Sequence, residues 1–300
     1  MLVKLYRKYI SKGIRDKIYK ALLGQVLFFL RHLGGNLKSK FIYLFRYILP
    51  DTEKNRLYAF MGKYGLMALP YPFILEYNTM HIDCLFDEQF NIYYIMHSGK
   101  KLYFPKIYSK EQVIENYRGL ITEQDPRSPH QYVTDLNRLK GKTLLDIGAA
   151  EAIFSLSVIE LVKHVYIFEC EEFWLEALTA TFAPWEDKVT IVRKYVSDTN
   201  DDDTITIDRF LEDKNKDNLF LKMDIEGYEQ AALRGGSDTL KEAHDIDFSI
   251  CTYHKKNDAI EIAKILQSYN LEYERTDGYL YFANEFRRVI IRRKLNNSAS

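Results

Sequence analysis

The chain has 300 residues, of which 47% are hydrophobic and 28% charged, a composition typical of a soluble globular protein with one or two domains. Its three cysteines, Cys84, Cys170 and Cys251, are scattered along the chain and form no CxxC pair. This pattern argues against a disulfide framework or a structural zinc site. It also indicates a reducing compartment, so we expect a cytoplasmic protein.

The net charge of zero conceals a strong asymmetry between two parts of the chain. Residues 1–50 contain eleven Lys and Arg but one acid, Asp16, which gives +10, whereas the rest holds 31 basic and 41 acidic residues. Apolar residues recur every four positions in this segment, as in an amphipathic helix: Tyr6, Ile10, Ile14, Ile18 and Leu22. The apolar run Ala21–Leu30 is too short to cross a bilayer.

Two interpretations fit residues 1–50. The segment can lie on an anionic membrane surface, which would make the protein peripheral at the inner membrane surface. It can equally pack as a helix against the body of the protein or another subunit. Nucleic acid is not expected as a partner, because the body is acidic and carries no base-reading motif.

Residues 51–139 form an aromatic-rich region ahead of the main fold. We expect short strands in Met67–Phe73 and Tyr93–Pro105, with a hairpin turn at His97–Lys101, and a helix over Lys110–Leu120. The loop Glu123–His130 contains two prolines and mixed charges. It is either a flap over a cofactor site or an ordinary connection.

The stretch from Thr143 to Cys170 predicts a βαβ unit. An apolar run ends at Asp146 and Ile147, a glycine follows at Gly148, a helical pattern comes next, and a second apolar run ends at Glu169. Ligands of such units bind at the carboxyl ends of the strands, where these polar residues fall. We therefore predict a nucleoside-binding half-site, with a plain ligand-free βαβ unit as the alternative.

The loop after the first strand indicates which nucleoside would bind. Glu169 follows Gly148 at about 20 residues, the separation at which an acid grips ribose hydroxyls. The loop has a single glycine, whereas a pyrophosphate site needs further glycines for close backbone approach. Acids at Asp146 and Glu151 would repel a pyrophosphate but suit a cation. These features favour S-adenosylmethionine, which carries a sulfonium and an ammonium group.

From Gly141 onward strands and helices alternate. After the βαβ unit we expect helices over Glu171–Phe182, Glu226–Leu240 and Asp258–Tyr269, and a short one from Thr206. Strands are expected at Val189–Val192, Leu219–Met223 and Asp247–Tyr253, followed by an antiparallel hairpin that turns at Asp277-Gly278. The predicted division is a basic segment (1–50), a lead-in region (51–139), the main α/β domain (140–294) and a disordered tail (295–300).

Three polar side chains at strand ends are candidates for acid–base chemistry: Asp224, Glu226 and His254. Parallel strands present their carboxyl ends along one edge, so these groups should converge on one cleft. The alternatives are ordinary structural roles. Glu226 would be a first-turn acid that favours a helix dipole, and His254 a histidine bonded to backbone.

These segments together carry a family resemblance. LLDIGAAEAIFSL, FEC, LFLKMDIEGYEQAALRGG and CTYHK resemble the FkbM methyltransferases, from about Thr143 to His254, and the lead-in YFP and EQDPRSPHQY is also similar. The resemblance implies an α/β, Rossmann-like class I methyltransferase sheet, mostly parallel with an antiparallel C-terminal hairpin, behind an N-terminal helical and β extension. In the family's motif glycine usually stands where this chain has Ala152.

The resemblance also implies O-methylation of a hydroxyl, often on a sugar, glycan or related natural product, with S-adenosylmethionine as cofactor. Asp146 would then contact the methionyl end, Gly148 would allow close backbone approach, and Glu169 would bind the ribose. Ser197 or Asp198 would lie near the adenine, and Ala149, Glu151 and Cys170 complete the expected cofactor site.

No metal ligand is predicted, although oxygen ligands would suit Mg²⁺. Two other classes of protein stay open on the sequence alone. One is a nicotinamide-dependent oxidoreductase on a related sheet. The other is a non-catalytic partner-binding protein that keeps the fold.

Overall fold

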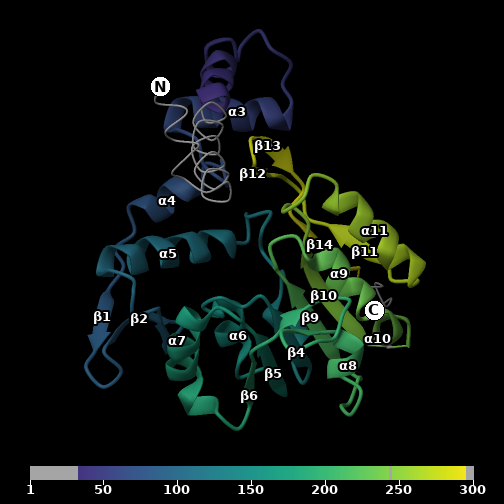
Figure 1. The fold of residues 1–300 in the computed structure, drawn as a ribbon. Coiled ribbons are helices and arrows are strands. Elements are labelled where there is room, and N and C mark those ends of the chain that lie inside the picture. The colour runs from purple at the N-terminus through teal and green to yellow at the C-terminus, as the bar shows by residue number, and fades with distance from the viewer. Residues whose placement is uncertain (1–32, 243–244, 295–300) are drawn as a thin grey trace, which may run out of the picture. The chain divides into compact units, whose positions relative to one another are not determined.

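The computed structural model describes residues 33–242 and 245–294. The predicted helix before residue 33 and the tail after residue 294 lie outside the described residues. The chain divides into two compact units. The first contains Met1–Pro72 and Ala283–Phe286, and the second contains Phe73–Phe282 and Arg287–Ser300. Strands and helices are labelled in Figure 1.

In the part of the first unit that the structure describes, two helices pack against each other. Residues 33–44 are helical, and α3 (Glu53–Tyr64) begins at an N-cap, Thr52, whose side chain accepts a hydrogen bond from Asn55 N. The helices approach closely at Gly62, where an added Cβ would lie 2.3 Å from the carbonyl oxygen of Ser39. Glycine at this position lets the two backbones pack.

The second unit is built on a seven-stranded sheet in the order β11-β14-β10-β9-β4-β5-β6. The β9–β10, β4–β9, β4–β5 and β5–β6 pairs are parallel, and β14 is antiparallel to both β10 and β11. The mostly parallel α/β sheet of the predicted class is thus confirmed. The strands are β4 (Thr143–Ile147), β5 (His164–Phe168), β6 (Val189–Val192), β9 (Leu219–Met223), β10 (Ile246–Cys251), β11 (Tyr273–Arg275) and β14 (Ile290–Arg293).

Helices cover the sheet on both faces. In the second unit α4 (Ile74–Asn78) and α5 (Lys110–Glu123) pack with each other, and α5 also packs with the strands β1 (Cys84–Asp87) and β2 (Ile92–His97). The other helices of this unit are η1 (Leu136–Leu139), α6 (Ile153–Val158), α7 (Glu172–Phe182), η2 (Ala183–Trp185), α8 (Ile207–Phe210), α9 (Glu229–Arg234), α10 (Ser237–Glu242) and α11 (Asp258–Ser268). Successive side chains of β9 point to opposite faces of the sheet. Leu219, Leu221 and Met223 join the core formed with α8 to α11. The Phe220 ring instead contacts Phe154 of α6, with centroids 5.9 Å apart. The polar neighbour Lys222 follows on this α6 side.

Shorter strands complete the unit. An antiparallel meander contains β1 (Cys84–Asp87), β2 (Ile92–His97) and β3 (Lys100–Tyr103), and β7 (Tyr195–Val196) pairs with β8 (Thr204–Ile205). The hairpin turn predicted near Gly99 is confirmed, because Ser98 and Gly99 have positive φ between β2 and β3. The strand predicted in Met67–Phe73 is wrong, since this proline-containing stretch forms turns that lead into α4.

The predicted turn of the C-terminal hairpin is also wrong. Asp277-Gly278 was expected to join two paired strands, but β11 pairs with β14, and β12 (Leu280–Phe282) is not its partner. The chain instead turns at Ala283 and Asn284, both with positive φ, before β13 (Glu285–Arg287). The antiparallel element at this edge is β14, inserted between β10 and β11.

No helix within residues 33–242 and 245–294 is long and apolar enough to cross a membrane.

Candidate active site

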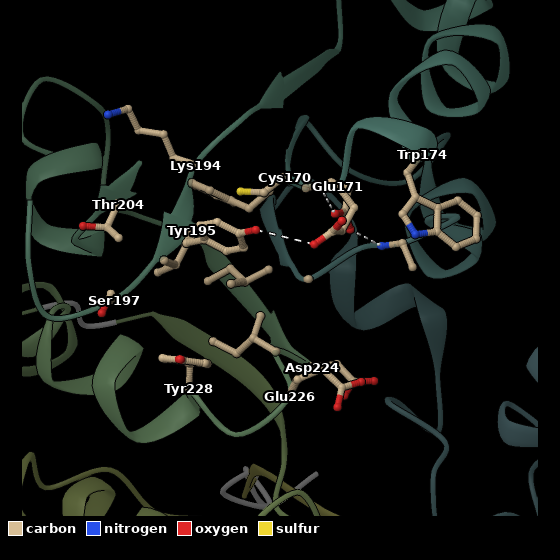
Figure 2. Close-up of a pocket in the computed structure, with 17 residues that line it drawn as sticks. Cys170, Glu171, Trp174, Lys194, Tyr195, Ser197, Thr204, Asp224, Glu226 and Tyr228 are labelled. Carbon is tan, nitrogen blue, oxygen red and sulfur yellow. Dashed lines mark hydrogen bonds between the residues drawn. The ribbon is translucent and has the colours of Figure 1, made fainter. Parts of the chain in front are cut away.

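A cavity of about 630 Å³ opens at the carboxyl ends of β4, β5 and β9, the sheet edge at which such folds bind ligands. Figure 2 shows its side chains. Four acids and one lysine line it, namely Glu169, Glu171, Asp224, Glu226 and Lys194. Four aromatic residues also line it, namely Phe168, Trp174, Tyr195 and Tyr228. The predicted Gly148, Glu169, Cys170, Ser197, Asp224 and Glu226 meet here. This negative lining suits a cationic ligand.

The loop after β4 brings backbone close to the cavity. Gly148 has a φ of 75°, and a Cβ built there would lie 2.1 Å from the carbonyl oxygen of Asp224. Only glycine fits this crossing of two strand ends without movement. Ala152 caps α6 in the left-handed region, with φ 57° and ψ 37°. This conformation explains why glycine would suit the position, and it costs alanine strain.

Glu169 organises the same loop from the end of β5. Its Oε2 accepts a hydrogen bond from Ala150 N at 2.9 Å, and its Oε1 accepts one from Glu171 N at 2.8 Å. The carboxylate is therefore held in one orientation at the cavity wall. Beside it, burial and the neighbouring acids Glu169 and Glu171 raise the pKa of the Cys170 thiol to about 11, so this side chain is neutral.

Asp146 lies beneath the cavity and does not line it. Its Oδ1 is 3.0 Å from Lys222 Nζ, and its Oδ2 accepts a hydrogen bond from Ser155 Oγ at 2.6 Å. The ion pair follows from strand register, because Asp146 and Lys222 are direct partners across β4 and β9. Lys222 Nζ also donates to the carbonyl oxygen of Gly148 at 2.6 Å. In this structure Asp146 therefore fixes the loop through Lys222.

The other predicted cofactor residues are divided between the cavity and its surroundings. Ala149 and Glu151 are buried outside the lining, and burial raises the pKa of Glu151 to about 8. Ser197 lines the cavity, whereas Asp198 forms an ion pair with Arg234 at 3.1 Å.

Asp224 contacts several polar side chains at one end of the cavity. It accepts hydrogen bonds from the hydroxyls of Tyr132 at 2.9 Å and Tyr253 at 3.2 Å. His254 Nε2 lies 3.3 Å from its Oδ1. Burial by itself raises the pKa of Asp224, but the nearby Lys222 and the two histidines His130 and His254 outweigh burial and lower it. Asp224 is therefore a carboxylate at neutral pH.

His254 lies behind Asp224, with its ring oriented by a second acid. Its Nδ1 is 2.7 Å from Oε1 of Glu229, a fully buried residue at the start of α9. Because the Glu229 carboxylate accepts a hydrogen bond from His254 Nδ1, the other ring nitrogen, Nε2, faces Asp224 and Glu226. Burial lowers the pKa of His254, but the hydrogen bond and charge of Glu229, with Asp224 and Glu226, raise it above its usual value.

Glu226 differs from its predicted place. A helix over Glu226–Leu240 is wrong, because α9 begins at Glu229 and the chain breaks before α10. Glu226 and Gly227 have φ of 53° and 95°, which no helix accommodates. Glu226 is thus a loop residue whose side chain is 86% exposed, with Oε2 3.8 Å from His254 Nε2.

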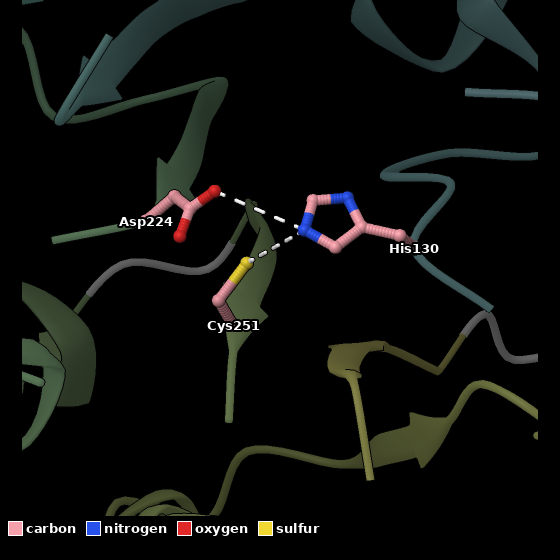
Figure 3. A group of neighbouring side chains, drawn as sticks. All are labelled: His130, Asp224 and Cys251. Atoms are coloured by element: carbon pink, nitrogen blue, oxygen red, sulfur yellow. Dashed lines mark hydrogen bonds and ion pairs between the residues drawn. The ribbon is translucent and has the colours of Figure 1, made fainter. Parts of the chain in front are cut away.

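Groups that could hold a metal ion also surround Asp224. Ligand atoms of His130, Asp224 and Cys251 lie within 4.8 Å of one another, and so do those of Asp224, Glu229 and His254. Figure 3 shows the first set, in which His130 Nε2 is 3.9 Å from both the Cys251 sulfur and Asp224 Oδ2. His130 Nε2 is also 3.2 Å from the Tyr253 hydroxyl, and burial lowers the pKa of His130 to about 4. In this first set, Asp224 is a carboxylate that lies among the neutral side chains of His130, Cys251 and Tyr253.

Sequence reasoning missed Tyr132, Lys222, Glu229 and Tyr253 as parts of this site. Lys222 carried a signal, because a charge inside an otherwise apolar strand needs a buried partner. The tyrosines carried none, since their contacts with Asp224 span 92 and 29 residues.

The comparisons with known proteins agree with this fold. The model of the "Methyltransferase FkbM domain" matches residues 159–275. Among solved structures, methyltransferase FkbM from Methylobacillus flagellatus KT is 17% identical with a TM-score of 0.42, covering 60% of this chain and 54% of that chain. This chain thus spans about half the length of that relative.

Two further structures are similar. Magnesium protoporphyrin IX methyltransferase from Synechocystis PCC 6803, with bound S-adenosylmethionine, is 16% identical with a TM-score of 0.39, covering 61% of this chain and 83% of its own. Precorrin-6y C5,15-methyltransferase from Geobacter metallireducens GS-15 is 14% identical with a TM-score of 0.36, covering 55% and 87%. Among curated proteins, no sequence matches this chain.

The fold and the family match together define a methyltransferase domain of the S-adenosylmethionine-dependent class. The match to the FkbM domain model over residues 159–275 confirms the resemblance seen in the sequence. The matched residues include Glu169, Asp224, Glu226 and His254, whereas the loop at Gly148 precedes them.

Proposed function

We propose that this protein transfers a methyl group from S-adenosylmethionine to a hydroxyl group of a sugar, glycan or related natural product. The observation that carries the proposal is the position of Asp224, which lines the same cavity as Gly148 and Glu169 and is backed by His254. The residues expected to bind the cofactor therefore lie in the same cleft as the proton-accepting pair, Asp224 and His254.

The residues of the cavity fit the cofactor. The close backbone approach at Gly148 leaves room beside the strand ends, and Glu169 offers oriented carboxylate oxygens for ribose hydroxyls. The four acids that line the cavity suit the sulfonium and ammonium charges. When bound, S-adenosylmethionine supplies an electrophilic methyl group.

Asp224 and His254 have different roles toward the acceptor hydroxyl. Asp224 lines the cavity and accepts the hydroxyl's hydrogen bond, while Tyr132 and Tyr253 hold the carboxylate in place. With S-adenosylhomocysteine as the leaving group of the methyl transfer, the proton released by the acceptor hydroxyl would pass to the Asp224–His254 pair. The lowered pKa makes Asp224 a weak proton acceptor, and the raised pKa makes neutral His254 the stronger one. A base positioned in this way contributes about 10²–10⁴-fold to the rate.

The aromatic lining supports a sugar-like acceptor. Tyr195 and Tyr228 are exposed and line the cavity, and Figure 2 shows both side chains. Rings of this kind present an apolar face together with a polar hydroxyl, which suits a ligand with both characters.

We place the reaction in the cytoplasm, with the protein peripheral at the inner membrane surface.

The test uses the full chain with S-adenosylmethionine labelled in its methyl group and fractionated cell-envelope glycans. We expect label in a glycan fraction with the wild type, and none with Asp224→Asn. Label on protein or nucleic acid alone would overturn the proposed acceptor. Binding of S-adenosylhomocysteine without transfer to any fraction would favour the non-catalytic alternative, and binding of NAD in its place would favour an oxidoreductase.

A further inference from the structure

The helix of residues 33–44 and the turn after it expose a row of large apolar side chains. They are Leu33, Leu37, Phe41, Leu44, Phe45 and Ile48, of which all but Phe45, which directly follows Leu44, are spaced three or four residues apart. Such spacing places them along one side of a helix. Leu44 is 69% exposed and Ile48 is 82% exposed. We name these six residues the apolar row.

The opposite side of the helix is already occupied within its own unit. Ser39 and Ile42 are buried, and the helix backbone meets Gly62 of α3. An ordinary surface helix buries its apolar side and exposes its polar side. Here the apolar row remains exposed although the helix has a packing partner, so it is available to another surface.

The charges around the apolar row are all positive. Residues 33–50 contain Lys38, Lys40 and Arg46 and no acid, and the preceding 32 residues hold eight more Lys and Arg against Asp16. Arg46 lies 4.3 Å from the ring centroids of both Tyr43 and Tyr47, and it donates a hydrogen bond to the Tyr47 hydroxyl. Tyrosine and arginine beside exposed aliphatic residues are typical of helices at a lipid–water interface.

We propose that the apolar row inserts into the surface of an anionic phospholipid bilayer, with Lys40 and Arg46 at the level of the headgroups. The occupant we infer is lipid, because anionic lipids attract the basic residues that flank the apolar row. The proposal is independent of the methyl transfer, since none of these residues lines the cavity. Of the two interpretations that the sequence allows for residues 1–50, the proposal takes membrane contact and assigns it to the apolar row.

The test is cosedimentation of the full-length protein with vesicles of phosphatidylglycerol and phosphatidylcholine, and with vesicles of phosphatidylcholine alone. We expect binding to the anionic vesicles that weakens with added salt. The variant Leu37→Gln/Phe41→Gln/Leu44→Gln should bind at least about tenfold more weakly, since three apolar side chains lose their insertion. Glutamine keeps the helix propensity, and these exposed positions carry little of the fold.

A matched control changes equally exposed apolar residues in the second unit, Ile107→Gln/Ile260→Gln. This control should bind vesicles like the wild type. Lys40→Ala/Arg46→Ala should lose about tenfold on anionic vesicles and nothing on neutral ones.

Three results would overturn the proposal. The first is wild-type protein that ignores anionic vesicles at low salt. The second is equal vesicle binding by the triple variant. The third is a concentration-dependent dimer, seen by light scattering, that the triple variant abolishes while vesicle binding is absent, since the apolar row would then cover a second copy. Methyl transfer to a soluble acceptor, measured on the same samples, reports separately on the proposed activity.

Discussion

Replacing Gly148 with alanine tests whether close backbone approach builds the cofactor cavity. An added Cβ would lie 2.1 Å from the carbonyl oxygen of Asp224 and 2.6 Å from Cγ2 of Ile225. Gly141 supplies a matched control, because its φ of 73° equals that of Gly148 at 75° within two degrees, yet a Cβ there meets nothing within 4 Å. The two substitutions therefore share the backbone strain and differ in the collision.

The expected losses of unfolding free energy follow from the backbone strain and from the collision of the added Cβ. Placing alanine in the left-handed region costs about 1–2 kcal/mol, and this should be the whole effect of Gly141→Ala. Forcing an extra methyl group into packed structure adds about 1–3 kcal/mol, so Gly148→Ala should lose about 2–5 kcal/mol of unfolding free energy. The collision also displaces Asp224, whose N–H bonds to the carbonyl of Ile147.

Urea unfolding gives the stability of both variants, and calorimetry gives their affinity for S-adenosylhomocysteine. We expect Gly148→Ala to lose most binding while Gly141→Ala binds like the wild type. Equal stability and equal affinity in the two variants would refute the reasoning, because the proximity of Gly148 to Asp224 would then have no consequence.

Three other substitutions test separate parts of the site. Ala152→Gly should raise the unfolding free energy by about 0.5–1 kcal/mol, since glycine relieves the left-handed strain, and a loss in urea unfolding would contradict this. Glu229→Gln should move the acidic limb of the kcat profile to lower pH. The imidazolium of His254 loses its anionic partner, its raised pKa falls, and the neutral base forms at lower pH; an unmoved limb would show that His254 takes no proton. Asp224→Asn should lower kcat by about 10²–10⁴-fold with cofactor affinity within a few-fold, and near wild-type turnover would remove Asp224 from the mechanism.

The sequence predicts the main domain well because its strands are continuous apolar runs. Thr143–Ile147 and Leu219–Met223 are buried along their whole length or nearly so, and such runs end at polar residues that mark the sheet edge. The helix at Glu226 was mispredicted for a local reason. Glu226 and Gly227 both have positive φ. Gly227 readily adopts this conformation and is a turn signal that the prediction passed over, whereas nothing in the residue type of Glu226 indicates it.

The candidate site is predictable only in part. Asp224 and His254 follow from their positions at strand ends, and Glu169 from its distance to Gly148. The Asp146–Lys222 pair depends on the register of β4 against β9, which is set by contacts between distant segments. The prediction that Asp146 contacts the cofactor stays a proposal, and Lys222 gives the residue a structural role as well.

The central claim is that the cavity beside Gly148 binds S-adenosylmethionine through Glu169, and one calorimetric experiment tests it directly. S-adenosylhomocysteine is titrated into the wild type, into Glu169→Gln and into Glu172→Gln, a control acid whose side chain is 90% exposed. Since Glu169 also bonds to Ala150 N and Glu171 N, the stability of each variant is measured alongside. Loss of a charged hydrogen bond costs about 1.5–3 kcal/mol, so Glu169→Gln should bind more than about tenfold more weakly, with the control unchanged. Unchanged affinity in Glu169→Gln, or tighter binding of NAD than of S-adenosylhomocysteine by the wild type, would contradict the claim.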